Sequence, residues 1–179
     1  MTTPIYLNLG CGGNILPAPW HNFDLDLDIR KPLPFNDATV DLIFAEHVVE
    51  HVTPAEAWRF FRECRRVLRP QGVLRVAVPS IERVFERSDR EYLAWMHGAG
   101  FGAPTKEAAV ENQIVNHGHQ AIWSAPLLLC CFDALGFARA AQVGVAWSEH
   151  APLRDIHGHG RVIGERNNEI ETIVVEAVR

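Results

Sequence analysis

Two histidines and a glutamate lie close together in the sequence, at a spacing that is found in metal enzymes. His47, Glu50 and His51 form an HxxEH pattern, which on a helix would place both histidines on one face, with the glutamate as a base beside a bound Zn²⁺. A zinc-dependent hydrolase that uses these residues therefore stays open as an alternative. Thr53 and Pro54 begin another helix directly afterwards, so the helix that carries the pattern has one or two turns at most. We expect no metal site.

A glycine-rich turn follows a short apolar run near the N-terminus. The run Ile5–Leu9 predicts a strand, which passes directly into Gly10, Cys11 and Gly12. Glycine allows a sharp turn and lets a ligand approach the backbone closely. A dinucleotide-binding fingerprint needs a third glycine where Ile15 stands, and the prolines that follow disfavour a long phosphate-binding helix. We therefore do not expect NAD or FAD.

Three aspartates alternate with apolar residues shortly after this turn. They are Asp24, Asp26 and Asp28, within the segment Phe23–Ile29. This alternation predicts a strand with the carboxylates on one face. An acid at the end of the second strand of a doubly wound fold binds the ribose of a nucleoside cofactor, and we assign this role to Asp24. An exposed polar strand edge is the alternative for each aspartate.

Hydrophobic patterning predicts the central elements that position these residues. Val40–Ala45 and Val73–Val78 are typical of strands buried on both faces of a parallel sheet. Between them, Pro54–Leu68 is predicted to be a helix, with Thr53 as its N-cap and Glu56 closing a capping box. The result is a strand, crossover helix and strand, a unit that is almost always right-handed.

The predicted crossover helix has an apolar and a basic side. Trp58, Phe61, either Cys64 or Arg65, and Leu68 recur at helical spacing, and this side is expected to pack on the sheet. The arginines form a separate stripe: Arg59, Arg62, Arg66 and Arg69. We interpret this stripe as a solvated outer face and not as a nucleic-acid site.

The second half of the chain predicts further helices and strands around a long polar segment. Helices are expected over Ile81–Met96 and Pro126–Leu135, and strands over Ala141–Trp147 and Glu171–Val178. The segment between those strands, Ser148–Glu169, has little periodicity. Long connections of this kind are usually lids, binding loops or disordered, so this segment is predicted to be either a functional loop or a mobile one.

Composition sets the class of protein. The chain has 179 residues, of which 47% are hydrophobic and 22% charged, with a net charge of −5. This size predicts a single domain over residues 1–179, and the acidic balance gives no reason to expect nucleic acid or a membrane surface as a partner. The four cysteines, Cys11, Cys64, Cys130 and Cys131, show no CxxC spacing. We expect no disulfide and a cytoplasmic location; the oligomeric state stays open.

The order of these motifs resembles that of the class I S-adenosylmethionine-dependent methyltransferases. The resemblance is strongest to the small bacterial proteins of the methyltransferase type 11 kind. It rests on LNLGCGG, NFDLD, PLPFNDATVDLIFAEHVVEH and RECRRVLRPQGVLRVAVP, in this order from residue 5 to about residue 80. It implies an α/β fold: one three-layer Rossmann-like domain with a mainly parallel sheet and an antiparallel C-terminal strand pair. The first helix is expected to be truncated, because about ten residues separate Gly13 from Phe23.

The resemblance also implies that S-adenosylmethionine lies across the carboxyl ends of the strands. The residues expected to contact it are Gly10, Cys11, Gly12, Asp24, Asp28, Leu33, Glu46 and His47. The glycine turn would lie against the methionine and ribose portion, Asp24 would hold the ribose, and Asp28 would lie near the adenine. Glu46 and His47 would border the transferable methyl group.

The expected activity is methyl transfer to an unidentified acceptor, with a small molecule favoured. A sulfonium is an activated electrophile, so the reaction needs mainly alignment, and a base only when the acceptor is protonated. His47, His117 and His150 are the candidate bases, since imidazole titrates near neutrality; a structural or surface histidine is the alternative for each. Besides the zinc hydrolase, a catalytically silent binding module with the same fold stays open.

Overall fold

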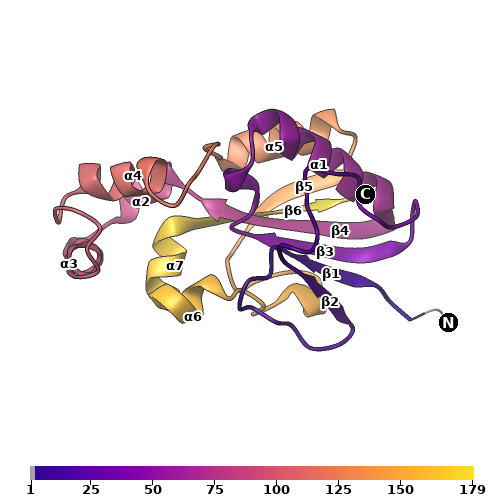
Figure 1. The fold of residues 1–179 in the computed structure, drawn as a ribbon, viewed down its shortest axis with the longest axis horizontal. Helices are drawn as coiled ribbons and strands as arrows, with labels where there is room; N and C mark the ends of the chain where they lie inside the picture. Colours follow the sequence, from indigo (N-terminus) through magenta and orange to yellow (C-terminus); the bar gives the residue numbers. More distant parts are fainter. Residues whose placement is uncertain (1–2) are drawn as a thin grey trace.

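The computed structural model describes residues 3–179, in which six strands form one mixed sheet. The strand order is β2-β1-β3-β4-β6-β5 (Figure 1). Neighbouring strands from β2 to β4 pair in parallel, whereas β6 is antiparallel to both β4 and β5. The strands are β1 Tyr6–Leu9, β2 Trp20–Phe23, β3 Val40–Glu46, β4 Leu68–Pro79, β5 Arg139–Val143 and β6 Thr172–Val178. The predicted mainly parallel sheet with an antiparallel C-terminal pair is confirmed.

Helices surround this sheet. Two short 3₁₀ helices are η1 Val49–His51 and η2 Ala151–Leu153. The α-helices are α1 Pro54–Val67, α2 Ile81–Arg87, α3 Arg90–Gly98, α4 Lys106–Val115, α5 Ala125–Ala134, α6 His159–Ile163 and α7 Glu165–Glu171. Figure 1 shows α2, α3 and α4 at the carboxyl end of the parallel strands, where they extend away from the sheet. Within the described residues, no helix has the length and apolar character needed to cross a bilayer.

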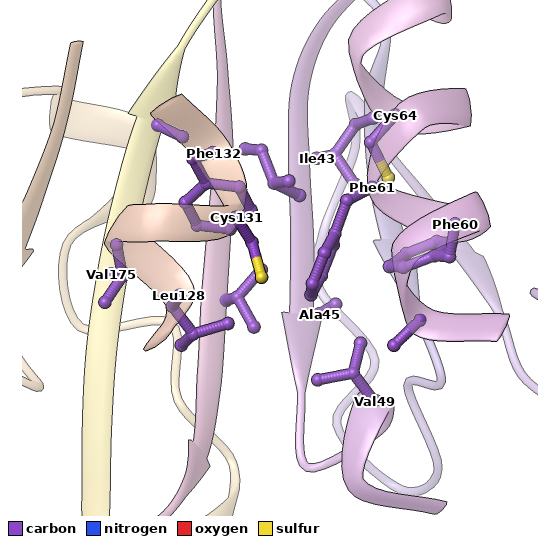
Figure 2. Close-up of a cluster of buried hydrophobic side chains, with 14 of the residues drawn as sticks. Ile43, Ala45, Val49, Phe60, Phe61, Cys64, Leu128, Cys131, Phe132 and Val175 are labelled. Carbon is purple, nitrogen blue, oxygen red and sulfur yellow. The ribbon is translucent and has the colours of Figure 1, made fainter. Parts of the chain in front are cut away.

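One face of the sheet is covered by α1 and α5, which form the larger core (Figure 2). The predicted capping box of α1 is present: Thr53 Oγ1 accepts from the Glu56 backbone N–H at 3.3 Å, and Glu56 Oε2 accepts from the Thr53 backbone N–H at 2.9 Å. The Phe61 ring packs edge-on against the Trp123 ring at 5.6 Å and the Phe132 ring at 5.1 Å. The predicted apolar side is wrong for Trp58, which is 38% exposed, because the buried stripe of α1 is one residue out of phase with it.

The opposite face is covered by the connection between β5 and β6. Within the described residues, no helix lies between β1 and β2, which agrees with the expected truncation of the first helix. Leu153 and Ile156 pack there against Leu42, Phe44 and Val73 of the sheet. In Figure 1 this connection passes, in orange, below the sheet. The polar segment Ser148–Glu169 is thus not a structureless loop, since it contains η2, α6 and most of α7.

The strand predicted over Phe23–Ile29 is wrong. β2 ends at Phe23 and the aspartates lie in turns, with Leu25 96% exposed. The Asp24 backbone N–H donates to Asp26 Oδ1 at 2.8 Å, a local bond of the kind that aspartate offers in competition with a strand ladder. The three carboxylates therefore do not share one face of a strand.

Two other elements differ from their predicted bounds for local reasons, and one helix was not predicted. The helix predicted over Ile81–Met96 is divided into α2 and α3, because Asp89 caps a new helix by accepting from the Tyr92 backbone N–H at 3.0 Å. The strand predicted over Ala141–Trp147 ends earlier, since the chain turns at Gly144, where the Trp147 backbone N–H donates to the Gly144 carbonyl at 3.2 Å. Helix α4 was not predicted, and its apolar residues form no clear stripe.

Candidate functional site

Three cavities meet at the carboxyl ends of the parallel strands. The Asp24 cavity, of about 330 Å³, is lined by Gly10, Asp24, Asp28, Val48, His51 and neighbouring residues. The Arg161 cavity, of about 310 Å³, is lined by Gly10, Cys11, Asn14, Glu46, Arg161 and neighbouring residues. The histidine cavity, of about 330 Å³, is lined by Glu50, His51, Trp95, Phe101, His117, His119 and neighbouring residues. His47 lines all three. Cavities of this size are typical of small-molecule sites.

Gly10 stands where β1 ends and joins the Asp24 and Arg161 cavities. Its φ is +67°, and a Cβ atom there would lie 2.3 Å from Val48 Cγ2. Any other residue would strain the backbone and displace Val48. Gly10 and Cys11 line the cavities, while Gly12, also at positive φ, is not among the lining residues.

Asp24 and Asp28 share the Asp24 cavity but differ in their partners. The Asp28 carboxylate accepts two hydrogen bonds from the Arg30 guanidinium, at 2.7 and 3.0 Å, and these bonds lower the pKa of Asp28 to about 2. Among residues 3–179, nothing donates a hydrogen bond to the exposed Asp24 carboxylate. Asp24 is therefore the carboxylate that a ligand in this cavity can reach.

Leu33 lies apart from the cavities. It is buried in the core under α1, its backbone N–H donates to Glu63 Oε2 at 3.1 Å, and its carbonyl accepts from Arg66 Nη2 at 3.0 Å. Its side chain does not line the Asp24 cavity. A contact between Leu33 and a ligand there stays a prediction without support from the lining residues.

Glu46 ends β3 and fastens the β5–β6 connection to the site. Its Oε1 accepts from His157 Nδ1 at 2.7 Å and its Oε2 accepts from the Gly158 backbone N–H at 2.7 Å. Burial raises the pKa of Glu46, but the His157 bond and charge outweigh it and lower the pKa below its ordinary value. Glu46 thus lines the Arg161 cavity as an ionised group whose oxygens are already engaged.

His157 connects Glu46 to a buried ion pair. Its Nε2 accepts from Arg75 Nε at 3.1 Å, and Arg75 is fully buried and paired with Glu176. Burial lowers the pKa of His157, and the Arg75 charge adds to this effect. A neutral imidazole that donates from Nδ1 and accepts at Nε2 satisfies both neighbours. Sequence patterning gave no sign of this arrangement, because its members are up to 130 positions apart.

His47 adopts a left-handed conformation, with φ +52°. Its Nε2 lies 3.0 Å from Thr172 Oγ1 and its Nδ1 lies 3.2 Å from Glu50 Oε1. Burial lowers the pKa of His47, but the adjacent Glu50 carboxylate and the charges of Glu46 and Glu171 outweigh it, so the pKa is raised. With both ring nitrogens engaged, His47 is poorly placed to take a proton from a substrate.

The two other candidate bases lie in different cavities. His117 lines the histidine cavity, and partial burial with the neighbouring His119 lowers its pKa, which favours the neutral form that a base requires. His150 lies with Trp147 and Glu149 in a separate cavity of about 150 Å³ beside β5. The structure therefore brings His47 and His117 together around the histidine cavity and leaves His150 outside the site.

The HxxEH pattern does not form the helical zinc site of the alternative hypothesis. His47 precedes η1 and has a left-handed φ, so His47 and His51 do not share a helix face. The residues whose ligand atoms do gather, within 4.8 Å of one another, are Glu50, His51 and His119.

Two further residues that were not among the expected cofactor contacts line the cavities. Arg161 of α6 lines the Arg161 cavity, where its Nη1 lies 3.4 Å from Asn14 Oδ1. His159 lines both the Arg161 and the histidine cavities, its ring 4.1 Å from that of His47. Both come from the polar segment, which patterning described as either a functional or a mobile loop.

Comparisons with known proteins agree with this architecture. Residues 20–76 match the family described as a methyltransferase domain. A probable S-adenosylmethionine-dependent methyltransferase of Mycobacterium tuberculosis is 46% identical over 48 residues, which are 27% of this chain and 17% of that protein. This chain thus matches about a sixth of that relative's length.

Solved structures show the same fold at low identity. A SAM-dependent methyltransferase from Archaeoglobus fulgidus superposes with a TM-score of 0.57 and 13% identity, covering 99% of this chain and 86% of that one. Phosphoethanolamine N-methyltransferase 2 of Haemonchus contortus, solved with S-adenosyl-L-methionine, superposes with a TM-score of 0.57 and 11% identity, covering 99% and 49%. The chain therefore has the Rossmann-like fold of the class I S-adenosylmethionine-dependent methyltransferases, and the resemblance read from its motifs is confirmed.

Proposed function

We propose that this chain binds S-adenosylmethionine across the Asp24 and Arg161 cavities and transfers its methyl group to a small molecule in the histidine cavity. The observation that carries the proposal is that His47, at the end of β3, lines all three cavities, while Gly10, at the end of β1, lines the Asp24 and Arg161 cavities. In open α/β sheets, ligands bind outside the carboxyl ends of the strands. The family match and the fold support the same activity.

The Asp24 cavity suits the adenosine portion. Asp24 offers an unpaired carboxylate that can accept hydrogen bonds from both ribose hydroxyls. Apolar side chains around it, among them Leu27, Ile29 and Val52, provide surface for a flat base. The residues present therefore fit a nucleoside, with Asp24 as its polar anchor and Arg30 holding Asp28 in place.

The Arg161 cavity suits the amino-acid portion. Arg161 brings a guanidinium that can bind a carboxylate with two parallel hydrogen bonds. Gly10 keeps the passage from the Asp24 cavity open, because no side chain projects from it. Glu46 and His157 hold α6, and with it Arg161, against the site.

Bound S-adenosylmethionine supplies an activated methyl group on a sulfonium, whose transfer leaves a neutral thioether. The acceptor's lone pair forms the new bond to the methyl carbon while the bond from that carbon to sulfur breaks. His117, kept neutral by its surroundings, is the base that can take the acceptor's proton. His47 serves to position groups, since Thr172 and Glu50 engage its nitrogens.

The test of transfer is incubation with methyl-labelled S-adenosylmethionine and a small-molecule fraction of cell extract. We expect label to enter a small molecule, and His117→Gln to slow this by roughly 10²–10⁴-fold if the acceptor is protonated. His21→Gln, an exposed change on β2 outside the three cavities, is the matched control.

Cofactor binding without any transfer would contradict the proposed activity and support the catalytically silent binding module. The structure offers no feature that favours this second function, so we do not propose it.

We also propose that residues 1–179 act as one domain in the cytoplasm, supported by one continuous sheet and four unpaired cysteines.

A further inference from the structure

Within the described chain, Glu50 is a buried carboxylate paired with a single polar side chain, His47, which contacts only one of its oxygens. It is 1% exposed, and neither of its side-chain oxygens has a partner in hydrogen-bonding geometry among the described residues. His47 Nδ1 lies 3.2 Å from Glu50 Oε1. A carboxylate can accept several hydrogen bonds, so one such neighbour does not satisfy it. Burying a carboxylate in this way costs several kcal/mol unless a cation or donors compensate it. Since His47 lies beside Oε1, it is Oε2, buried without a partner in residues 3–179, that can bind a further cation.

Two histidines bring nitrogens to the same place. Ligand atoms of Glu50, His51 and His119 lie within 4.8 Å of one another. The ligands of one ion, at bond lengths of about 2.0–2.2 Å, lie within roughly 4 Å of each other, so this set is close to the spacing that one ion requires. His51 is exposed, and its ring lies 5.0 Å from the ring of His119.

The orientation of His119 is that of a prepared ligand. Its Nδ1 lies 2.7 Å from the carbonyl oxygen of Gln113, so Nδ1 carries the proton and Nε2 keeps its lone pair. Histidines that bind metals usually donate their other N–H to a carbonyl or a carboxylate in this way.

The backbone fixes the three residues relative to one another. The Gln120 and Ala121 backbone N–H groups donate to the Glu50 carbonyl at 2.7 and 3.2 Å. Gln120 Nε2 donates to the His51 carbonyl at 2.7 Å. The segment that carries His119 is thus bonded directly to η1, which carries Glu50 and His51, and the set does not depend on one mobile side chain.

We propose that Glu50, His51 and His119 bind a divalent transition-metal ion at the wall of the histidine cavity. Two imidazoles and one carboxylate suit Zn²⁺, Co²⁺ or Fe²⁺ and not Mg²⁺ or Ca²⁺, which take oxygen ligands. Three protein ligands leave coordination positions open toward the cavity. Glu50 is a ligand here and His47 is not, which distinguishes this site from the HxxEH arrangement.

The test is titration of chelator-treated protein with Zn²⁺ by calorimetry and with Co²⁺ by visible absorption, which reports the geometry of the bound ion. We expect one equivalent to bind. Loss of a residue that only hydrogen-bonds to a metal ligand typically weakens metal binding by roughly 10–100-fold. Because His51 and His119 would themselves be ligands, His51→Ala and His119→Ala should each weaken binding by more than this. His21→Ala, which removes an exposed histidine elsewhere, should leave binding unchanged.

Glu50→Gln separates a metal ligand from a structural partner of His47. The metal-free variant should unfold at the same temperature as the metal-free parent or above it, because an amide costs less to bury than a carboxylate, while its Co²⁺ affinity falls. The proposal is overturned if the parent binds no equivalent of either ion, or if His51→Ala and His119→Ala bind as the parent does. Metal binding is read directly, so the result is independent of whether the chain transfers methyl groups.

Discussion

The two faces of the sheet are covered in opposite ways. On one face, α1 and α5 bury aromatic and aliphatic side chains with few polar contacts (Figure 2). On the other, where no helix follows β1, an irregular connection is held by Leu153 and Ile156 and by the buried groups Arg75 and His157. Both faces stabilise the fold. The irregular face also brings Arg161 and His159 to the site, so it alone combines stability with function.

The largest effect is expected at the buried ion pair of the irregular face. Glu176→Ala leaves the Arg75 guanidinium buried without its carboxylate, which should lower the free energy of unfolding by about 3–5 kcal/mol in urea titrations. Glu149→Ala is the matched control, because Glu149 pairs with Arg139 at 2.9 Å on the surface, and such pairs contribute about 1 kcal/mol or less. Equal losses in the two variants would contradict the structural role of the buried pair.

Apolar packing should be similar on the two faces. Leu153 and Leu128 are both fully buried, the first under the irregular face and the second in α5. Each change to alanine should cost about 2–4 kcal/mol of unfolding free energy, from lost burial and the cavity left behind. A cost below about 1 kcal/mol for Leu153 alone would show that the irregular face is not packed in solution.

The next largest effect is expected on ligand binding at the carboxyl ends of the strands, where Asp24 lies. Asp24→Ala should weaken binding of S-adenosylhomocysteine by roughly 1.5–3 kcal/mol, through two lost charge-assisted hydrogen bonds. Calorimetry measures this change, with Asp133→Ala on the exposed side of α5 as control. An affinity within error of the parent would show that another group holds the ribose.

The smallest expected effect is a dependence of the free energy of unfolding on pH, caused by His157 on the irregular face. The folded-state pKa of His157 lies below its unfolded value, so below about pH 6.5 the unfolded chain binds more protons and the folded state loses stability as pH falls. The slope approaches about 1.4 kcal/mol per pH unit for one proton. His157 faces Arg75, Glu46 and, farther away, His47.

Urea titrations between pH 7 and 5 measure this slope. His157→Gln should flatten it relative to the parent, whereas His21→Gln should not. Glu46 adds a second loss at lower pH, because its folded-state pKa is also lowered and its stabilising charge disappears as pH falls through that pKa. An identical slope in the parent and His157→Gln would contradict the neutral, buried state of His157.

The helical face could be predicted from sequence because its signals are local. The cap at Thr53, the periodicity of α1 and the apolar runs of β3 and β4 lie within a few residues of the elements they specify. The order of the motifs then indicated the methyltransferase fold. Trp58 shows the limit, since periodicity identified a stripe but not its phase.

The irregular face could not be predicted because its bonds join distant positions. Arg75 meets His157 across 82 positions, and Glu46 meets His157 across 111. The candidate site was found in part: Gly10, Asp24 and His47 line the cavities, while Leu33 and His150 do not. Only the contact between the segment of His119 and η1 places this histidine beside Glu50, and that contact joins positions about 70 residues apart.

The central claim is that S-adenosylmethionine binds where the Asp24 and Arg161 cavities meet. The most direct measurement is calorimetric titration of the purified chain with S-adenosylhomocysteine, with Arg161→Met in parallel. The account predicts one-to-one binding in the micromolar range, weakened in the variant through the lost partner of the ligand's carboxylate. Absence of binding to the folded parent, or binding that neither Asp24→Ala nor Arg161→Met weakens, would contradict it.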